Sequence, residues 1–379
     1  MKLSTIKIKL LLLVNKLFDV FPISKRKIVF TSFSGKYYND NPKAVYLEMQ
    51  KQNINADYVW LMKNSNVTIA GAKVINWRSL SAIYELATAK IWIDNVRKPE
   101  WICKRVGQYY IQTWHGSIAL KRIEKDVESK LSTDYIRKAK NDSKMIDLFI
   151  SSGSWASNNY KDAFWYDGEI IETGSPRTDI FYGELSDIKT KVYKFYNLSE
   201  DVRIVLYVPT FRADGNMQCY DLDFQKLFNS LKDRYGGTWK IVVRLHPNIA
   251  RKQNLISYTA DILNGTVYED MNELIVACDM LITDYSSCMF DAMECGKKVV
   301  LYASDVNEYM DDRGTYFTFK QLPFALAQNN DELNTIIQDF DEMMYLDNVK
   351  SFLDICGIVN NGHASEKVVE RIKDILNKD

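Results

Sequence analysis

The sequence contains few histidines and none of the usual nucleotide-binding loops. Only three histidines occur among 379 residues, His115, His246 and His363. Neither a GxGxxG nor a GxxxxGKS pattern is present, which removes the main support for Rossmann dinucleotide and P-loop chemistry. The six cysteines form no CxxC pair, so we expect reduced thiols in a cytoplasmic protein and no zinc site.

The chain also carries no excess of charge of one sign. Lys plus Arg and Asp plus Glu both number 49, so no overall field attracts a polyanion, and nucleic acid is not an expected partner. Hydrophobic residues make up 46% of the sequence and proline is scarce, with 7 residues, as in globular rather than disordered proteins. The length predicts two domains.

A long hydrophobic run is missing as well. The longest unbroken apolar run near the N-terminus, residues 10–14, is far short of the roughly 20 residues that cross a bilayer. Apolar residues nevertheless recur at helical spacing at positions 3, 6, 10, 13, 17 and 21, with lysines at 2, 9 and 16 on another face. This pattern predicts an amphipathic helix ended by Pro22, either lying on an anionic membrane surface or packed on the first domain.

After this helix, short β-branched runs alternate with longer helical stretches. The alternation predicts βαβ units and parallel sheets, and hence an α/β fold with two doubly wound domains. We expect strands at residues 27–32, 56–61, 91–94, 109–113, 148–152 and 170–173, and then at 203–208, 240–244, 266–268, 280–283 and 298–301. Expected helices in the first half include 42–52, 80–89, 134–144 and 154–164. The predicted divisions are 1–23 for the amphipathic helix, 24–185 for the N-terminal domain and 186–379 for the C-terminal domain.

Two of the histidines directly follow predicted strands. His115 comes after Tyr-Ile-Gln-Thr-Trp, and His246 comes after Val-Val-Arg-Leu, with Arg244 two residues earlier. Ligands of open parallel sheets bind at the carboxyl ends of strands, where a histidine can take a proton from a hydroxyl and an Arg–His pair can hold a phosphate. A stacked His115 and a helix-capping His246 are the structural alternatives.

A third strand end carries hydroxyl groups. Thr283-Asp284-Tyr285-Ser286-Ser287 leads from a predicted strand into a predicted helix, and free amides at a helix start with adjacent hydroxyls favour a diphosphate. N-capping by Asp284 or Ser286 is the simpler alternative. Arg212, after the strand at 203–208, is a further candidate phosphate ligand or an ordinary surface arginine. Asp221 and Asp223 are interpreted as helix-start acids, and no carboxylate cluster demands a metal or another cofactor.

Several separated motifs together resemble one family, the CDP-glycerol glycerophosphotransferases of teichoic acid and capsule synthesis. The motifs are Asn41-Pro42-Lys43, Gln112-Thr113-Trp114-His115-Gly116, Gly174-Ser175-Pro176-Arg177-Thr178-Asp179, Pro209-Thr210-Phe211-Arg212, Arg244-Leu245-His246-Pro247, Thr283-Asp284-Tyr285-Ser286-Ser287 and Gly362-His363-Ala364-Ser365-Glu366. They occur in family order from about residue 27 to the C-terminus, so the resemblance covers nearly the whole chain.

The resemblance implies a GT-B architecture of two Rossmann-like domains, the first meeting acceptor and membrane and the second holding the CDP donor. It places His115 and His246 on the catalytic histidines of the family. The donor-binding positions that we expect are Arg212, Arg244, Thr283, Asp284, Ser286 and Ser287, and the expected acceptor-binding positions are Gly116, Ser117 and Arg177. An acceptor hydroxyl would attack the β-phosphorus of the donor and release CMP.

The sequence departs from the family pattern at two places. The family commonly has His-Gly-Thr-Pro where this chain has Ser117-Ile118 after the glycine, and Gly-Tyr-Pro-Arg-Asn-Asp where this chain has Gly-Ser-Pro-Arg-Thr-Asp. Both departures fall on the expected acceptor side. His363 lies where the family does not require histidine, so we expect it to be structural or exposed.

The expected partners are CDP-glycerol or another CDP-polyol, a lipid-linked acceptor and an anionic membrane surface, with a homo-oligomer possible. The expected place of action is the cytoplasmic face of the cell membrane, as a peripheral protein. Two other hypotheses stay open. One is a GT-B glycosyltransferase that uses a nucleotide sugar, because the fold does not fix the transferred group. The other is a non-catalytic membrane-bound scaffold.

Overall fold

The computed structural model describes residues 3–210, 212, 220–245, 256–306 and 314–378. The chain divides into two compact units. Unit 1 comprises Met1–Ser117, Ile123–Asp179 and Ile358–Asp379, and unit 2 comprises Ile118–Arg122 and Ile180–Gly357. Each unit is built around its own parallel sheet, as the alternation of strands and helices in the sequence predicts.

Unit 1 contains a seven-stranded sheet in the order β3-β2-β1-β4-β5-β6-β7. All its strand pairs are parallel. Its strands are β1 (Ser24–Thr31), β2 (Asp57–Met62), β3 (Lys73–Asn76), β4 (Ala89–Asp94), β5 (Tyr109–Gln112), β6 (Leu148–Ser151) and β7 (Glu169–Glu172). Six of these seven match predicted strands, whereas β3 was not predicted because its short Lys-Val-Ile-Asn run is only half-buried.

The helices of unit 1 cover both faces of this sheet. They are α1 (Leu3–Phe18), α2 (Asp40–Lys51), α3 (Leu80–Thr88), α4 (Thr133–Ser143), α5 (Ser154–Ala163) and α13 (Ala364–Asn377), with 3-10 turns η1 (Phe33–Gly35), η2 (Glu124–Lys130) and η3 (Pro176–Tyr182), the last reaching into unit 2. Side-chain caps explain some of the helix starts. Ser79 accepts from the Ala82 amide at the start of α3, and Ser132 accepts from the Tyr135 amide at the start of α4.

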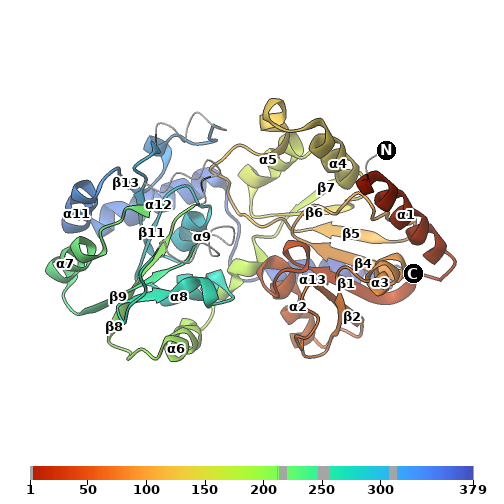
Figure 1. The fold of residues 1–379 in the computed structure, drawn as a ribbon, viewed down its shortest axis with the longest axis horizontal. Helices are drawn as coiled ribbons and strands as arrows, with labels where there is room; N and C mark the ends of the chain where they lie inside the picture. Colours follow the sequence, from red (N-terminus) through yellow and green to blue (C-terminus); the bar gives the residue numbers. More distant parts are fainter. Residues whose placement is uncertain (1–2, 211, 213–219, 246–255, 307–313, 379) are drawn as a thin grey trace. The chain divides into compact units, whose positions relative to one another are not determined.

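The strands are apolar throughout because each face of the sheet packs on helices. On one face, Ile28 and Phe30 of β1 pack with residues of α2 and α13, while on the other face Val29 packs with residues of α3 and α5. Figure 1 shows α13 beside α2, although more than 300 residues separate them in the sequence.

The position of α13 corrects the predicted domain limits. We predicted that residues 186–379 all belong to the C-terminal domain, but Ile358–Asp379 belong to unit 1. The physical reason is the apolar stripe of α13, in which Val368 and Ile372 are fully buried in the core of unit 1. The stripe completes a face of the first sheet, which no pattern within α13 itself could reveal.

The N-terminal helix α1 is present as predicted and ends at Phe18, before Pro22. One side of α1 packs on unit 1, where the Asn15 amide donates to the Trp101 carbonyl at 2.7 Å and the Phe18 ring meets the Tyr84 ring at 5.7 Å. In the described parts of the chain, no helix is both long enough and apolar enough to cross a membrane.

Unit 2 contains a six-stranded sheet in the order β10-β9-β8-β11-β12-β13. Its strands, again parallel, are β8 (Val202–Val208), β9 (Thr238–Val243), β10 (Ile262–Asn264), β11 (Met280–Thr283), β12 (Lys298–Tyr302) and β13 (Ala325–Ala327). Its helices are α6 (Leu185–Tyr196), α7 (Phe224–Tyr235), α8 (Met271–Ala277), α9 (Cys288–Glu294), α11 (Asn330–Gln338) and α12 (Glu342–Cys356), with 3-10 turns η5 (Gly265–Val267) and η6 (Phe319–Gln321). Asp223 caps α7, which confirms its interpretation as a helix-start acid.

One predicted strand of unit 2 is wrong. The strand expected at 266–268 lies earlier, as β10, and Gly265–Val267 form the turn η5. The Asn264 side chain accepts from the Thr266 amide at 2.9 Å and so starts the turn, as asparagine side chains often do. Gly265 also lies against β9, where an added Cβ would come within 2.8 Å of Val242.

Candidate functional site

Both sheets reverse their strand order at one point, and the predicted motifs follow strands near these points. In unit 1 the reversal lies between β1 and β4, and in unit 2 it lies between β8 and β11. Ligand sites of open parallel sheets form outside the carboxyl ends of strands at such reversals. Each unit is described separately below, beginning with the strand ends of unit 1.

His115 lies just beyond β5 and is held by the loop that follows β4. Its Nδ1 atom is 2.7 Å from the backbone oxygen of Asn95. A carbonyl oxygen can only accept, so Nδ1 carries a hydrogen, and Nε2 is the basic nitrogen of the neutral ring. The side chain is half-buried and its ring lies 4.3 Å from the Trp114 ring and 5.4 Å from the Phe33 ring. His115 therefore stacks against Trp114, as the structural alternative predicts, and at the same time keeps Nε2 as its basic nitrogen.

The surroundings of His115 favour its neutral form. Burial lowers the pKa of His115 below its ordinary value, and the positive charge of Arg177 lowers it further. The hydrogen bond to Asn95 and the negative charges of Asp40 and Asp94 act in the opposite direction. Since the net shift of the pKa is downward, the imidazole is neutral at neutral pH and can accept a proton.

The backbone around His115 is unusually conformed. Phe33, Ser34, Asp40 and Trp114 all have positive φ angles, of 46°, 54°, 62° and 48°. Non-glycine residues adopt this region at a cost of about 1–3 kcal/mol each, and such strained residues cluster at functional sites. All four belong to the loop after β1, the start of α2 or the turn after β5, so the strain is concentrated beside the histidine.

The predicted acceptor residues lie close by in unit 1 and are engaged in its interior. The Gly116 carbonyl accepts from the Tyr160 hydroxyl at 3.1 Å, and the buried Ser117 Oγ lies 2.9 Å from Ser175 Oγ. The guanidinium of Arg177, also buried, lies 3.4 Å from the Asp40 carboxylate.

In unit 2, Arg212 is buried between two carboxylates. Its Nε lies 2.5 Å from Asp305 and an Nη lies 2.8 Å from Asp284, and only 5% of its side chain is exposed. The guanidinium also covers the Tyr285 ring at 4.7 Å, and the Tyr285 hydroxyl donates to Asp305 at 2.9 Å. The surface-arginine alternative is therefore wrong, and Arg212 joins the ends of β8, β11 and β12.

Asp284 and Thr283 also hold this corner of unit 2 together. The Asp284 carboxylate accepts from the Thr210 amide at 2.9 Å and from the Tyr285 amide at 2.6 Å, and the Thr283 hydroxyl donates to the Val208 carbonyl at 2.6 Å. Both side chains are buried. These bonds fix the path of the chain from β11 towards α9.

The two serines of this motif lie at the start of α9, as predicted. Ser287 is the residue before the helix, and neither Asp284 nor Ser286 caps it through a side chain. The simple capping alternative is therefore wrong. Ser286 is half-buried and Ser287 is exposed, in contrast with the buried Thr283 and Asp284.

Arg244 follows β9 and holds the turn after β10. It donates to the Gly265 carbonyl at 3.0 Å, to the Tyr268 carbonyl and to the Glu269 carbonyl at 3.3 Å. The predicted catalytic residue His246 lies outside the described residues, as do Phe211 and Pro247 of the motifs. Its place relative to Arg244 therefore stays a prediction.

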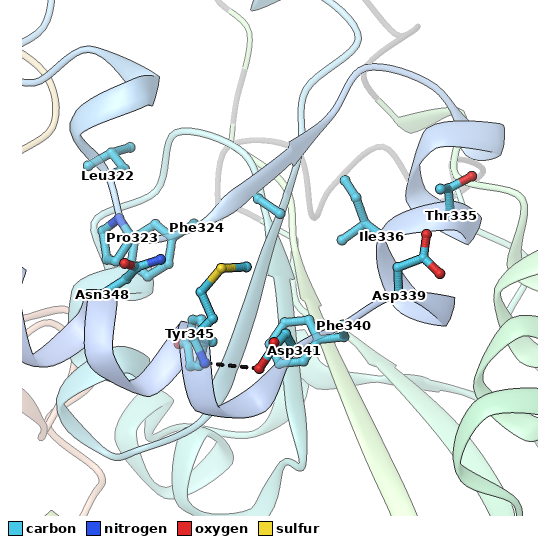
Figure 2. Close-up of a pocket in the computed structure, with 12 residues that line it drawn as sticks. Leu322, Pro323, Phe324, Thr335, Ile336, Asp339, Phe340, Asp341, Tyr345 and Asn348 are labelled. Carbon is cyan, nitrogen blue, oxygen red and sulfur yellow. Dashed lines mark hydrogen bonds between the residues drawn. The ribbon is translucent and has the colours of Figure 1, made fainter.

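His363 is exposed, as predicted, and pairs with Glu366 at 2.8 Å on α13. A cavity of about 400 Å³ in unit 2 is lined by Phe324, Ile336, Phe340 and Tyr345 with their neighbours (Figure 2). None of the predicted site residues lines it. Among the described side chains, no group of three or more His, Cys, Asp and Glu residues could hold a metal ion.

Comparisons with known proteins identify the family. Residues 13–374 match the family described as CDP-Glycerol:Poly(glycerophosphate) glycerophosphotransferase. The chain belongs to this family.

Similar members of the family include polymerases. A teichoic acid poly(glycerol phosphate) polymerase of Bacillus spizizenii is 27% identical over 387 residues, covering 98% of each chain. Another, of Staphylococcus epidermidis, is 31% identical over 94% of this chain, which spans 51% of that protein's length. The solved structure of the wall teichoic acid polymerase TagF is 28% identical, with a TM-score of 0.86 over 99% of this chain and 98% of that chain. The chain is therefore a transferase with a GT-B fold, which confirms the resemblance, the fold class and the enzyme class.

Sequence reasoning missed four residues that build these two strand ends. Asp40 and Asn95 surround His115, and Tyr285 and Asp305 surround Arg212. Three of them carried a signal in the sequence, and Tyr285 lies within the quoted motif from Thr283 to Ser287. Asp40 directly precedes the Asn41-Pro42-Lys43 motif, and Asn95 follows a predicted strand. Asp305 lies beyond every quoted motif.

Proposed function

We propose that this glycerophosphotransferase transfers glycerol phosphate from CDP-glycerol to a hydroxyl of a lipid-linked or polymeric acceptor in teichoic acid synthesis. The observation that carries the proposal is His115, which lies beyond β5 beside the strand reversal of unit 1, with Nε2 as its basic nitrogen and a pKa lowered by burial. Family membership supplies the donor class. The comparison with polymerases of teichoic acid supports the polymeric acceptor.

In the proposed reaction, His115 Nε2 takes the proton of the acceptor hydroxyl while the hydroxyl oxygen attacks the β-phosphorus of the donor. The bond from the β-phosphorus to the bridging oxygen breaks, and CMP leaves with the electron pair. The product is a phosphodiester. His246 is proposed to neutralise the leaving group, and the hydroxyls of Ser286 and Ser287 are proposed to contact the diphosphate.

The other predicted donor and acceptor residues support this reaction mainly through structure. Arg212, Thr283 and Asp284 fix the strand ends that precede the two serines. Arg244 fixes the turn after β10. We propose that their effect on donor binding is exerted through these positions, while Gly116, Ser117 and Arg177 shape the acceptor side around His115.

The decisive experiment measures CMP release from CDP-glycerol by the purified protein with a lipid-linked acceptor, beside CDP-ribitol and a nucleotide sugar. We expect CMP release with CDP-glycerol and a phosphodiester signal in the ³¹P spectrum of the product. His115→Ala should lower release by about 10²–10⁴-fold, because it removes the general base. His246→Ala should also lower release, because it removes the group proposed to neutralise the leaving group. A glycosidic product would favour the glycosyltransferase hypothesis, and inactivity with every donor would favour the scaffold.

We further propose that α1 binds an anionic membrane surface on the cytoplasmic face. Leu10, Leu13 and Leu17 are 59%, 56% and 60% exposed, and they form a stripe along the side of α1 that does not pack on unit 1. Lys9 and Lys16 are exposed beside this stripe. An amphipathic helix with such a stripe and flanking lysines suits an interface of anionic lipids.

Vesicle sedimentation tests this surface. The triple variant L10Q/L13Q/L17Q should lose binding to vesicles with anionic lipid, because each leucine side chain that becomes buried in the membrane contributes about 1.5–3 kcal/mol to binding. Its CMP release with a detergent-soluble acceptor should persist. Leu47→Gln on α2 is the matched control, since Leu47 is 48% exposed outside α1 and should leave binding unchanged. Equal binding by the triple variant would contradict the proposal.

A further inference from the structure

We propose that Asp40 and Arg177 are a pair of positioning residues that orient His115 and hold it ready to accept a proton, acting through Asn95 and Asn41. The role of His115 as a base rests on the proposed function. The structural part of the inference does not, because it concerns contacts within unit 1 alone.

Asn95 is the first link between the pair and the histidine. Its backbone oxygen accepts from His115 Nδ1 at 2.7 Å, and its side-chain nitrogen donates to Asp40 Oδ1 at 3.0 Å. Its side-chain oxygen accepts from the Phe33 amide at 2.8 Å. Because its nitrogen donates to Asp40 and its oxygen accepts from Phe33, the orientation of the Asn95 side-chain amide is fixed. The carbonyl that selects the histidine tautomer therefore belongs to a residue that Asp40 holds in place.

Asp40 is held in an uncommon conformation at the start of α2. Its φ angle is 62°, a value that carries strain for a residue with a side chain. In this conformation its carboxylate accepts from the Asn41 amide at 2.8 Å as well as from Asn95. The Arg177 guanidinium lies 3.4 Å away, with 6% of the arginine and 12% of the aspartate side chain exposed. The two charges are thus largely removed from water and depend on each other.

Arg177 reaches the histidine by a second route. Its backbone amide donates to Asn41 Oδ1 at 2.9 Å. The Asn41 side-chain nitrogen donates to the carbonyls of Thr113 at 3.1 Å and Trp114 at 3.0 Å. These carbonyls belong to the turn that presents His115. The charged pair is therefore connected to both sides of the imidazole, through the loop after β4 and through the turn after β5.

The charges of Asp40 and Arg177 act on the pKa of His115 in opposite directions, which allows an experiment to test the role of this pair. Asp40 and Asp94 raise the pKa of His115, whereas Arg177 lowers it. Asp94 is itself paired with the buried Lys98 at 2.6 Å. Removal of the Asp40 charge should therefore lower the pKa of His115, and removal of the Arg177 charge should raise it. A general loosening of the site cannot produce shifts of opposite sign.

The first test is the pH dependence of kcat/KM for CMP release from CDP-glycerol. On the acid side the rate falls as His115 becomes protonated. We expect this limb to move to lower pH by about one unit in Asp40→Asn and to higher pH by a similar amount in Arg177→Gln. The double variant should return close to the wild-type limb, and Arg177→Lys should stay there. Glu48→Gln is the control, since Glu48 also lies on α2 but bonds to Lys51 and Gln52. Unchanged limbs, or shifts in the same direction, would overturn the inference.

The second test does not depend on turnover. With only three histidines in the sequence, ¹⁵N-histidine NMR of the full chain can follow His115 directly, and His115→Gln assigns its signals. We expect the neutral ring to carry hydrogen on Nδ1 and its titration to move in opposite directions in the two variants. A neutral ring with hydrogen on Nε2 would overturn the inference in the wild-type protein itself, even if no variant folds. Failure of CMP release with every donor would instead overturn the proposed function.

Discussion

The two strand reversals use charged groups in contrasting ways. In unit 1 the ion pair of Asp40 and Arg177 supports a neutral, half-buried histidine. In unit 2 the arginine itself is the centre, buried between Asp284 and Asp305. The first arrangement leaves a group that can exchange a proton, and the second joins three strand ends. The strand ends near the two reversals thus hold a single histidine in one case and a buried ion network in the other.

The largest effect on stability should come from Arg212→Ala. The substitution leaves two buried carboxylates without their common partner, which lowers the free energy of unfolding by about 3–5 kcal/mol. Urea denaturation of the full chain measures this loss. Arg203→Ala is the control, because Arg203 lies at the other end of β8 and is exposed, and it should cost far less. A loss below about 1 kcal/mol in Arg212→Ala would mean that the buried arginine does not join the strand ends, since an exposed ion pair contributes no more than that to stability.

Asn41→Ala should lower both the stability of the protein and its rate of CMP release, and the effect on the rate should be the larger. It removes the Asn41 side-chain bonds to the carbonyls of Thr113 and Trp114 and to the amide of Arg177, at a cost of about 2 kcal/mol. The displaced turn should reduce CMP release about 100-fold. Asn64→Ala, at an exposed position of unit 1, is the control. Loss of stability with unchanged release would mean that the turn does not position His115.

Tyr285→Phe should lower the free energy of unfolding moderately, through contacts of unit 2 alone. It removes the hydroxyl that donates to Asp305 at 2.9 Å but keeps the ring beneath Arg212. Hydrogen bonds to charged groups contribute about 1.5–3 kcal/mol, so urea denaturation should show a loss in that range. Tyr182→Phe provides the comparison, because the Tyr182 hydroxyl meets Glu294 at an exposed position and should change stability little. Equal losses would show that burial does not strengthen the Tyr285 bond.

Most of the strands were predictable because their signal is local, but β3 and β13 were not predicted and β10 was expected at 266–268. Met280–Thr283 match the predicted strand, since a run buried on both faces is apolar without interruption. The partners of Arg212 were not predictable. Asp305 follows β12, and only the order β8-β11-β12 brings it to an arginine 93 residues away. The partners of Asp40, Asn95 and Arg177, likewise lie 55 and 137 residues away in the sequence. Patterns within a segment therefore indicated most of the strand ends, while the charge partners found there came from tertiary structure.

The smallest effect on stability should come from His363→Ala, because this histidine of unit 1 is exposed, whereas His115 is half-buried and held by the loop after β4. His363 is exposed and pairs only across one helical turn with Glu366 among its described contacts, so the change in unfolding free energy should stay within about 0.5 kcal/mol. CMP release should be unchanged.

The start of α13 is instead capped by Asp179, which accepts from the amides of Ala364 at 3.0 Å and Ser365 at 2.7 Å. Asp179→Ala should therefore cost about 1 kcal/mol at the same helix end. If His363→Ala cost more than Asp179→Ala, the tail histidine would carry a structural role that its exposed contact does not explain.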